Sequence, residues 1–471
     1  MGRHCRPQHC AATAVKVIRW AAVLTLANVL ADMAVGSPMM VLPQLLEQFR
    51  TDQAAWLSTS ALLAGAIWSP LLAKASDIAG KRRILITTLV LAGVGAVVCL
   101  VAPNLWIFLV GRFFQGAAFA AVFLTVALVL QICAPATAMA VVGVVTSGSA
   151  VIGIIEPFLM QPVIAAYGHR SVFLVAALLA ATAAVGVRLV VPESPIRTAG
   201  HIDVAGALLL GGGLAALLAY LSLGGDAGWL SGGMMALAAA GLTALAGWIV
   251  LARTLDEPII ELRALTRPIL LTLLAVVLAA GAFRSMLQLT SIIAQVPAEA
   301  GLGYGLGDRN AVAVLLAAPN LGIVIGGAAA GWLAGRMGPA WPLLAGVALG
   351  TVATFAMVVG ASVLPVAVAC GVTIGVAAGA VGASGYNLAT SLQTPQRQGV
   401  TAGMVSVVMA LGSVVVTFAG GEVLKATRLP GVAASSATGV TTYIVLAGVV
   451  FALAAIPAAM VVITRRRDAR V

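Results

Sequence analysis

The sequence predicts an all-α polytopic membrane protein, and three observations support that prediction. The 471 residues are 61% hydrophobic and only 9% charged, whereas soluble domains carry about 25% charged residues. The mean hydropathy is +1.10. Apolar runs of about 20 residues, the length of a membrane-spanning helix, follow one another along almost the whole chain. Lipid is therefore expected to be the main solvent of this protein.

Breaks at charged, Pro-rich or Gly-rich positions divide the chain into about fourteen predicted spans. The first seven cover residues 18–41, 54–75, 84–102, 105–132, 138–164, 170–191 and 203–223. The other seven cover residues 229–251, 269–296, 309–334, 340–361, 363–389, 399–420 and 440–463. The first run is longer than the apolar part of a signal peptide, so it is predicted to be a retained span.

An even number of spans places both termini on one side of the membrane. Of the 26 Lys and Arg residues, 19 then lie in tails and loops on that side and five on the other. The positive-inside rule makes the terminal side cytoplasmic and accounts for the net charge of +11 without nucleic acid. Arg outnumbers Lys 22 to 4, which is typical of a GC-rich bacterial genome, so we expect a bacterial cytoplasmic membrane.

Four ionisable residues interrupt the apolar runs: Asp32, Arg112, Glu156 and Arg284. A charge near the bilayer centre costs about 2.5–3.5 kcal/mol on insertion scales. Such residues indicate a polar pathway through the membrane, or ion pairs that line one.

Other function classes lack support in the sequence. There is no nucleophile elbow, HExxH helix, phosphate-binding Gly-Lys-Ser/Thr loop or acidic metal cluster. The five Cys residues do not resemble a disulfide framework, and the His/Cys-containing segment 4–10 is interpreted as a basic tail rather than a metal site. We therefore expect neither an enzyme nor a cofactor.

Two loops resemble each other, residues 73–83 after the second span and residues 331–338 after the tenth. Such a duplication indicates two related bundles around a midplane site. The first loop also resembles the signature between spans 2 and 3 of the major facilitator superfamily. The matching residues are Asp77, Gly80, Lys81, Arg82 and Arg83.

Further motifs follow in the order that this superfamily shows. Residues 112–116 (Arg-Phe-Phe-Gln-Gly) resemble its Arg-x-x-Gln-Gly motif, and residues 168–170 (Gly-His-Arg) resemble its Gly-Trp-Arg. Residues 397–399 (Arg-Gln-Gly) fit the start of its eleventh core helix. The chain is identified as a member of the superfamily on these motifs.

Fourteen spans resemble the branch of drug:proton antiporters with fourteen helices. The segments at 201–206 and 257–263 resemble the beginning and end of that branch's inserted helix pair. The resemblance implies a six-helix bundle over residues 1–195, two inserted helices over 196–255 and a second six-helix bundle over 256–471.

The chain departs from this branch at two places. In span 5 the branch usually has the motif Gly-Pro-x-x-Gly-Gly. Here Glu156 stands where the motif has the glycine before the proline (Pro157), and Met160-Gln161 stand where it has the final glycine pair. Asp32 lies eleven residues before Pro43, where the branch has its Asp nine before. These departures bear on multidrug specificity more than on the fold.

The residues deep in the spans receive candidate roles with open alternatives. Asp32 is a candidate proton carrier, or else a member of a static ion pair. Glu156 is a second candidate proton carrier or a counter-charge for a cationic substrate, or else a protonated, hydrogen-bonded residue beside Pro157. Arg112 is a candidate counter-charge that tunes Asp32, or else binds backbone carbonyls. Arg284 either pairs with these carboxylates or binds an anionic group of the substrate.

Other candidates line the expected cavity or its rim. Gln115, Gln288, Asn320, Tyr386 and Asn387 either contact substrate or form helix–helix hydrogen bonds. A gating role is implied by the resemblance for Asp77, Gly80, Lys81, Arg82, Arg83, Arg336 and Pro157. In particular, Asp77 is expected to accept hydrogen bonds from the N-terminus of a neighbouring helix and to latch the bundles together in the outward-open state.

The resemblance and the charges together favour a monomeric secondary transporter. The main hypothesis is proton-coupled efflux of hydrophobic or amphipathic compounds by alternating access, with a small-molecule substrate, protons and membrane lipids as partners. The alternative is a dedicated exporter or symporter of one metabolite, lipid-like or anionic compound, and Arg284 favours it.

Overall fold

The computed structural model describes residues 7–133, 135–194, 203–255, 258, 266–297, 301–307, 309–391, 398–428 and 435–468. Its elements are long α-helices, and one isolated bridge, Arg428 with Ser435, is the sole extended pairing in the described ranges. The predicted all-α fold is thus confirmed.

Each predicted span corresponds to a helix or a broken helix. The first eight helices are α1 (Pro7–Met40), α2 (Leu42–Phe49), α3 (Ala54–Ala79), α4 (Lys81–Val101), α5 (Leu105–Gln115), α6 (Phe119–Ile132), α7 (Pro135–Tyr167) and α8 (Ser171–Val190). The others are α9 (Val204–Ala227), α10 (Gly232–Thr254), α11 (Arg267–Ile293), α12 (Arg309–Met337), α13 (Ala340–Gly360), α14 (Leu364–Ser391), α15 (Gln398–Ala426) and α16 (Ala437–Asp468).

Thirteen helices within the described ranges are long and apolar enough to cross a membrane. The remaining expected span, residues 138–164, corresponds to α7, which counts only through its shorter apolar stretch Val151–Tyr167. Since α7 has 33 residues, its length of about 50 Å would suffice for a span.

Two local breaks were not predicted. The first span ends at Val41, and Pro43 opens the short helix α2 because proline suits the first turn of a helix. The fourth span is divided by a 3₁₀ turn, η1 (Gly116–Ala118). Gly116 lies against α3 there, and a Cβ atom at this position would come within 2.5 Å of the Ala61 carbonyl oxygen.

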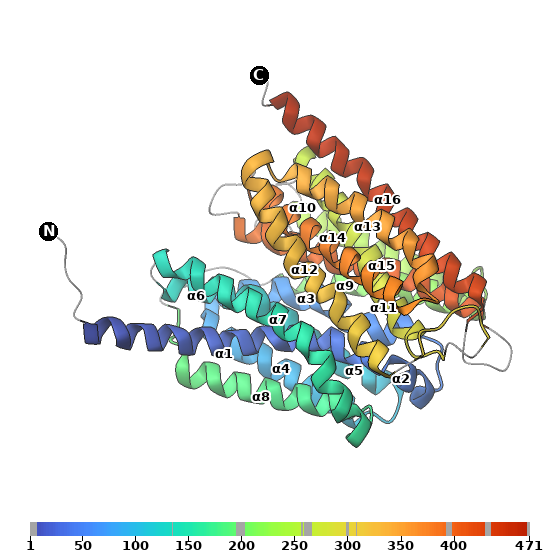
Figure 1. Cartoon of the computed structure of the whole chain (residues 1–471), viewed down its shortest axis with the longest axis horizontal. Coiled ribbons are helices and arrows are strands. Elements are labelled where there is room, and N and C mark those ends of the chain that lie inside the picture. Colours follow the sequence, from blue (N-terminus) through green and yellow to red (C-terminus); the bar gives the residue numbers. More distant parts are fainter. Residues whose placement is uncertain are drawn as a thin grey trace.

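The helices pack in two groups. Helices α1 and α3–α8 contact mainly one another, and α11–α16 do the same. Figure 1 shows the two groups close together near α2 and diverging toward the side where α1 begins and α16 ends. We call that divergent end the terminal side and the other end the α2 side.

The helix pair α9–α10 packs as a hairpin beside the seam between the groups. Helix α9 contacts both α3 and α15, and its Leu218 belongs to a small buried cluster with Leu62 and Phe418. The predicted domain boundaries remain a prediction, but the hairpin clearly bridges both groups.

Apolar side chains cover the outside of the molecule. Leu178, Val352 and Leu230 are examples of large hydrophobic residues that are well exposed. Exposed apolar surface of this extent suits contact with acyl chains rather than water.

Within the second group, backbones touch where glycines face each other. A Cβ atom at Gly375 of α14 would lie 2.1 Å from the Pro319 carbonyl oxygen of α12, and one at Gly326 would lie 2.0 Å from the Val376 oxygen. Small residues thus let α12 and α14 approach closely, as expected for helices in a bilayer.

Gly375→Ala is expected to destabilise the protein by about 1–3 kcal/mol, because the added methyl group forces the two backbones apart. The matched control is Gly331→Ala in α12, where a Cβ atom would meet nothing within 4 Å. Thermal unfolding of the purified proteins in detergent measures the difference. Equal melting temperatures for both variants would contradict the close packing.

Candidate functional site

Three of the four ionisable residues predicted from the sequence come together between the helix groups. Asp32 of α1 and Arg284 of α11 lie within electrostatic reach of each other, and Asp32 also lies within reach of Glu156 on α7. Arg284 comes from the second helix group and both carboxylates come from the first. The cluster therefore joins the two groups through charge.

Glu156 is the enclosed member of this cluster. Its side chain is buried, it accepts a short hydrogen bond from the Ser37 hydroxyl, and it packs against Gly36 of α1. Both contacts come from α1, so Glu156 is held in place by that helix.

Asp32 and Arg284 are the accessible members. Asp32 is exposed although it lies well inside α1, and Arg284 is partly exposed. Among the described residues, neither has an ion-pair partner within 4.0 Å. Both charges are therefore available to a ligand or to each other.

The predicted pairing of Arg112 with Asp32 is not present in this structure. Arg112 is fully buried, and its Nη1 donates to the Ala34 carbonyl oxygen and to Gln115 Oε1, both at 2.6 Å. Its Nη2 lies 3.5 Å from the Ser58 carbonyl oxygen. The guanidinium fork matches carbonyl oxygens on two neighbouring helices, so Arg112 braces α1, α3 and α5.

The predicted polar lining residues differ in burial, and two of them make contacts across the helix groups. Gln288 of α11 accepts a short hydrogen bond from Ser58 of α3, and its buried Nε2 has no hydrogen-bond partner in the described part. Asn320 of α12 donates to the Gly153 carbonyl oxygen of α7 at 2.9 Å. Both join the helix groups, while Tyr386 is half-buried and Asn387 exposed on α14.

Further contacts between the groups lie at the α2 side, and the sequence did not single them out. Gln295 of α11 donates to the Met40 carbonyl oxygen at 3.3 Å and accepts from Gln44 of α2 at 3.2 Å. Ser291 donates a short hydrogen bond to the Met39 carbonyl oxygen. Polar residues at span ends usually face headgroups, so sequence alone gave no signal for this contact.

Two more contacts close the same side. Lys425 and Asp52 approach to 4.0 Å, and the Trp56 ring meets the Phe418 ring edge-on with centroids 4.8 Å apart.

His169 joins the turn between α7 and α8 to α2, within the first helix group. Its ring nitrogen Nε2 lies 2.5 Å from Gln48 Oε1. Burial and the neighbouring Arg170 charge lower the pKa of His169, so this imidazole is neutral at pH 7.

The basic loop at the terminal side is organised within the first group. Asp77 pairs with Lys81 at 2.6 Å instead of accepting from another helix, so the expected latch is not formed in this structure. Glu193, which the sequence analysis missed, accepts from the backbone N–H groups of Arg82 at 2.9 Å and Arg83 at 3.2 Å. It thus satisfies the N-terminal amides of α4.

The remaining gating candidates have separate environments. Gly80 has a positive φ of 106°, and a Cβ atom there would come within 3.0 Å of the Glu193 carboxylate. Arg336, in the related loop, is exposed and lies 3.9 Å above the Trp332 ring. Pro157 lies buried inside α7 next to Glu156.

Arg112→Lys is expected to lower the free energy of unfolding by about 1.5–3 kcal/mol for each charge-assisted hydrogen bond lost, because one ammonium cannot reproduce the fork. Thermal unfolding in detergent measures this loss. The pH dependence of transport should stay unchanged, since Arg112 is bound to carbonyls. A shifted pH profile with unchanged stability would instead favour the tuning role.

Glu193→Ala is expected to cost about 0.5–2 kcal/mol of stability, because the first-turn amides of α4 lose their acceptor. Glu193→Gln should lose less, since it keeps one acceptor oxygen. Asp77→Asn is the control, because the Asp77 side chain is 48% exposed and solvent screens its ion pair. Melting curves that rank Asp77→Asn below Glu193→Ala in stability would contradict this assignment.

The geometry agrees with comparisons to known proteins. The chain is 29% identical over 348 residues to a multidrug resistance protein B homolog of Mycobacterium tuberculosis (strain CDC 1551 / Oshkosh), covering 71% of this chain but only 62% of that relative. It is 27% identical over 323 residues to a uridine/deoxyuridine transporter of Lactococcus lactis subsp. cremoris, covering 66% of each chain.

Solved transporter structures share the fold. The human organic anion transporter MFSD10 (TETRAN) matches with a TM-score of 0.59 and 18% identity, covering 94% of this chain and 99% of that one. A POT family transporter in complex with 5-aminolevulinic acid matches with a TM-score of 0.65 and 12% identity, covering 94% and 95%.

The family model described as Major Facilitator Superfamily matches residues 24–311, which is more than half of the chain. Together with the helical membrane fold and the charged cluster between two helix groups, this match shows that the chain belongs to the Major Facilitator Superfamily.

Proposed function

We propose that this chain is a proton-coupled secondary transporter that exports amphipathic or hydrophobic compounds by alternating access. It acts in a bacterial cytoplasmic membrane with both termini in the cytoplasm. The multidrug resistance relative supports efflux, although the chain spans only 62% of that protein's length. The asymmetry of the basic residues supports the orientation.

One observation carries the proposal: Asp32, Glu156 and Arg284 converge from three helices on the boundary between the helix groups. A carboxylate that gains a proton there loses its attraction to Arg284. Since Arg284 belongs to the other group, protonation weakens a contact that spans the moving boundary. Proton uptake and the movement of the groups are thereby coupled.

The contacts between the groups define the state that must change. Besides those of Gln288 and Asn320, they lie at the α2 side, through Gln295, Ser291 and Lys425, while the loops holding Asp77 and Arg336 lie at the divergent terminal side. With the termini cytoplasmic, this is an inward-facing conformation. The outward-facing state requires these contacts to break and the Asp77 loop to meet the second group.

A dedicated transporter of one metabolite, lipid-like or anionic compound is the second candidate. Arg284 favours it, because a fixed guanidinium in the site does not help a transporter that selects cations. The relatives named for multidrug resistance and for uridine/deoxyuridine transport differ in cargo. Expression in a drug-sensitive host separates the candidates, since resistance to many unrelated drugs supports the first.

The test of proton coupling uses proteoliposomes with an imposed pH gradient and a panel of compounds. Asp32→Asn should lower gradient-driven transport at least about tenfold, which corresponds to ~1.4 kcal/mol. Substrate exchange without a gradient should persist, because it needs no change of protonation.

The matched control is Asp203→Asn. Asp203 accepts from Gly206 N at 2.6 Å as the N-cap of α9, and Asn serves equally well as an N-cap. Full gradient-driven transport by Asp32→Asn would remove Asp32 from the mechanism. Equal losses in both variants would point to a general defect in folding.

A further inference from the structure

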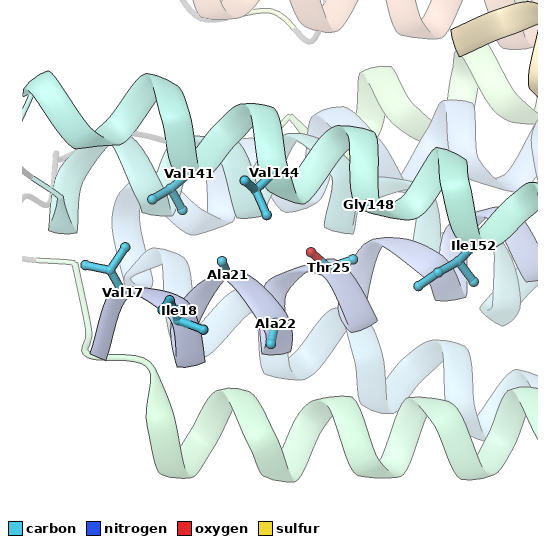
Figure 2. A pocket seen from close by; sticks show the side chains of 9 residues that line it. All are labelled: Val17, Ile18, Ala21, Ala22, Thr25, Val141, Val144, Gly148 and Ile152. Atoms are coloured by element: carbon cyan, nitrogen blue, oxygen red, sulfur yellow. The ribbon is translucent and has the colours of Figure 1, made fainter. Parts of the chain in front are cut away.

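An apolar groove runs between α1 and α7 on the terminal side of the charged cluster. Figure 2 shows side chains of both helices bordering it, including Ile18 and Ala22 of α1 and Val144 of α7. Its volume is about 630 Å³, within the range of about 300–1,000 Å³ usual for small-molecule sites. Thr25 of α1 and Gly148 of α7 lie on opposite sides of it, and a Cβ atom on Gly148 would come within 2.9 Å of Thr25.

The groove leads to the charged residues along both helices. Ile18, Thr25 and Asp32 are spaced seven residues apart, so they lie within about 40° of one another on α1. Gly148, Ile152 and Glu156 are spaced four apart and likewise share a face of α7. Thr25 and Asp32 differ by about 10 Å along the helix axis. The faces of α1 and α7 that border the groove therefore also carry Asp32 and Glu156 farther along each helix.

The charges at that end suit a head that carries both signs. Asp32 is exposed and Arg284 partly exposed, from opposite helix groups, with no ion pair within 4.0 Å between them in the described part of the chain. The two side chains lie within electrostatic reach of each other, so one ligand can place a positive group beside Asp32 and a negative group beside Arg284. Glu156 is buried and already bonded to Ser37, so the accessible charges are Asp32 and Arg284, and a purely cationic or anionic head would contact only one of them favourably.

We propose that the transport site takes a zwitterionic amphiphile with a single linear alkyl chain. The head lies between Asp32 and Arg284, and the chain lies in the groove between α1 and α7. This inference rests on the proposed transport function and names its substrate class. The apolar groove favours a single alkyl chain, and the opposite charges of Asp32 and Arg284 favour a zwitterionic head.

The test is equilibrium binding to the purified protein in nanodiscs, without a pH gradient and corrected for empty nanodiscs. The probes are octyl, decyl and dodecyl phosphocholine, with glycerophosphocholine as the head alone. Affinity should rise by up to about fourfold for each methylene added, as expected for burial of a CH₂ group. Glycerophosphocholine should bind far more weakly than any of them.

Groove occupancy is tested by Val144→Phe against Val185→Phe. The two valines are equally exposed, 57% and 56%, but Val185 lies on α8 away from the groove. Val144→Phe should weaken dodecyl phosphocholine binding about tenfold and leave glycerophosphocholine binding unchanged, which shows that the variant is folded. Equal binding of the dodecyl probe to both variants would overturn the groove assignment and leave the groove to bulk lipid.

The preference for a zwitterionic head is tested with ligands that share the same dodecyl chain and differ in the charge of the head. Dodecyl phosphocholine should bind at least tenfold more tightly than dodecyltrimethylammonium or dodecyl sulfate. Arg284→Gln should abolish the preference for the zwitterion over the cation. A cation bound as tightly as the zwitterion by the wild type would refute the proposal. Because binding needs no gradient, these outcomes are independent of whether transport is proton-coupled.

Discussion

The structure depends on how each charge inside the membrane is compensated. Arg112 is fixed by carbonyl oxygens of α1 and α3 and by Gln115, all within its own helix group. Glu156 is held by Ser37, again within that group. Asp32 and Arg284, in contrast, face each other from different groups and are accessible. The first kind of compensation lies within one helix group, whereas the second kind lies between groups and, in the proposed transport cycle, changes when the groups move.

The contacts within a helix group also differ from the contacts between the two groups. Inside the second group, glycines bring backbones into contact, and such interfaces cannot slide without clashes. Between the groups, apolar contacts such as Trp56 with Phe418 are joined by side-chain hydrogen bonds such as Gln295 to Met40 and Asn320 to Gly153. Bonds of this kind can be exchanged for others at small cost. Rigid groups joined by exchangeable contacts are what movement around a central site requires.

The relatives show the difference between fold and cargo. A human organic anion transporter and a POT family transporter in complex with 5-aminolevulinic acid share the helical arrangement at identities of 18% and 12%, so the arrangement alone selects no substrate. Selection must come from local features of this chain. The Glu156 that replaces a motif glycine, the Arg284 in α11 and the groove between α1 and α7 are such features. They meet within a few helical turns of one another.

The sequence by itself determined the class of protein, the approximate ends of the spans and the identity of the embedded charges, because apolar run length and isolated ionisable residues are properties of neighbouring positions in the chain. It could not assign partners. For Arg112 it left open pairing with Asp32 or with backbone carbonyls, and the structure shows the carbonyls. Asp77 was expected to accept from the N-terminus of a neighbouring helix but pairs with Lys81, and Glu193 caps α4. Such pairings join residues as many as 111 positions apart. Only the rotation and close approach of packed helices decide which side chains meet, and that information lies in the tertiary structure.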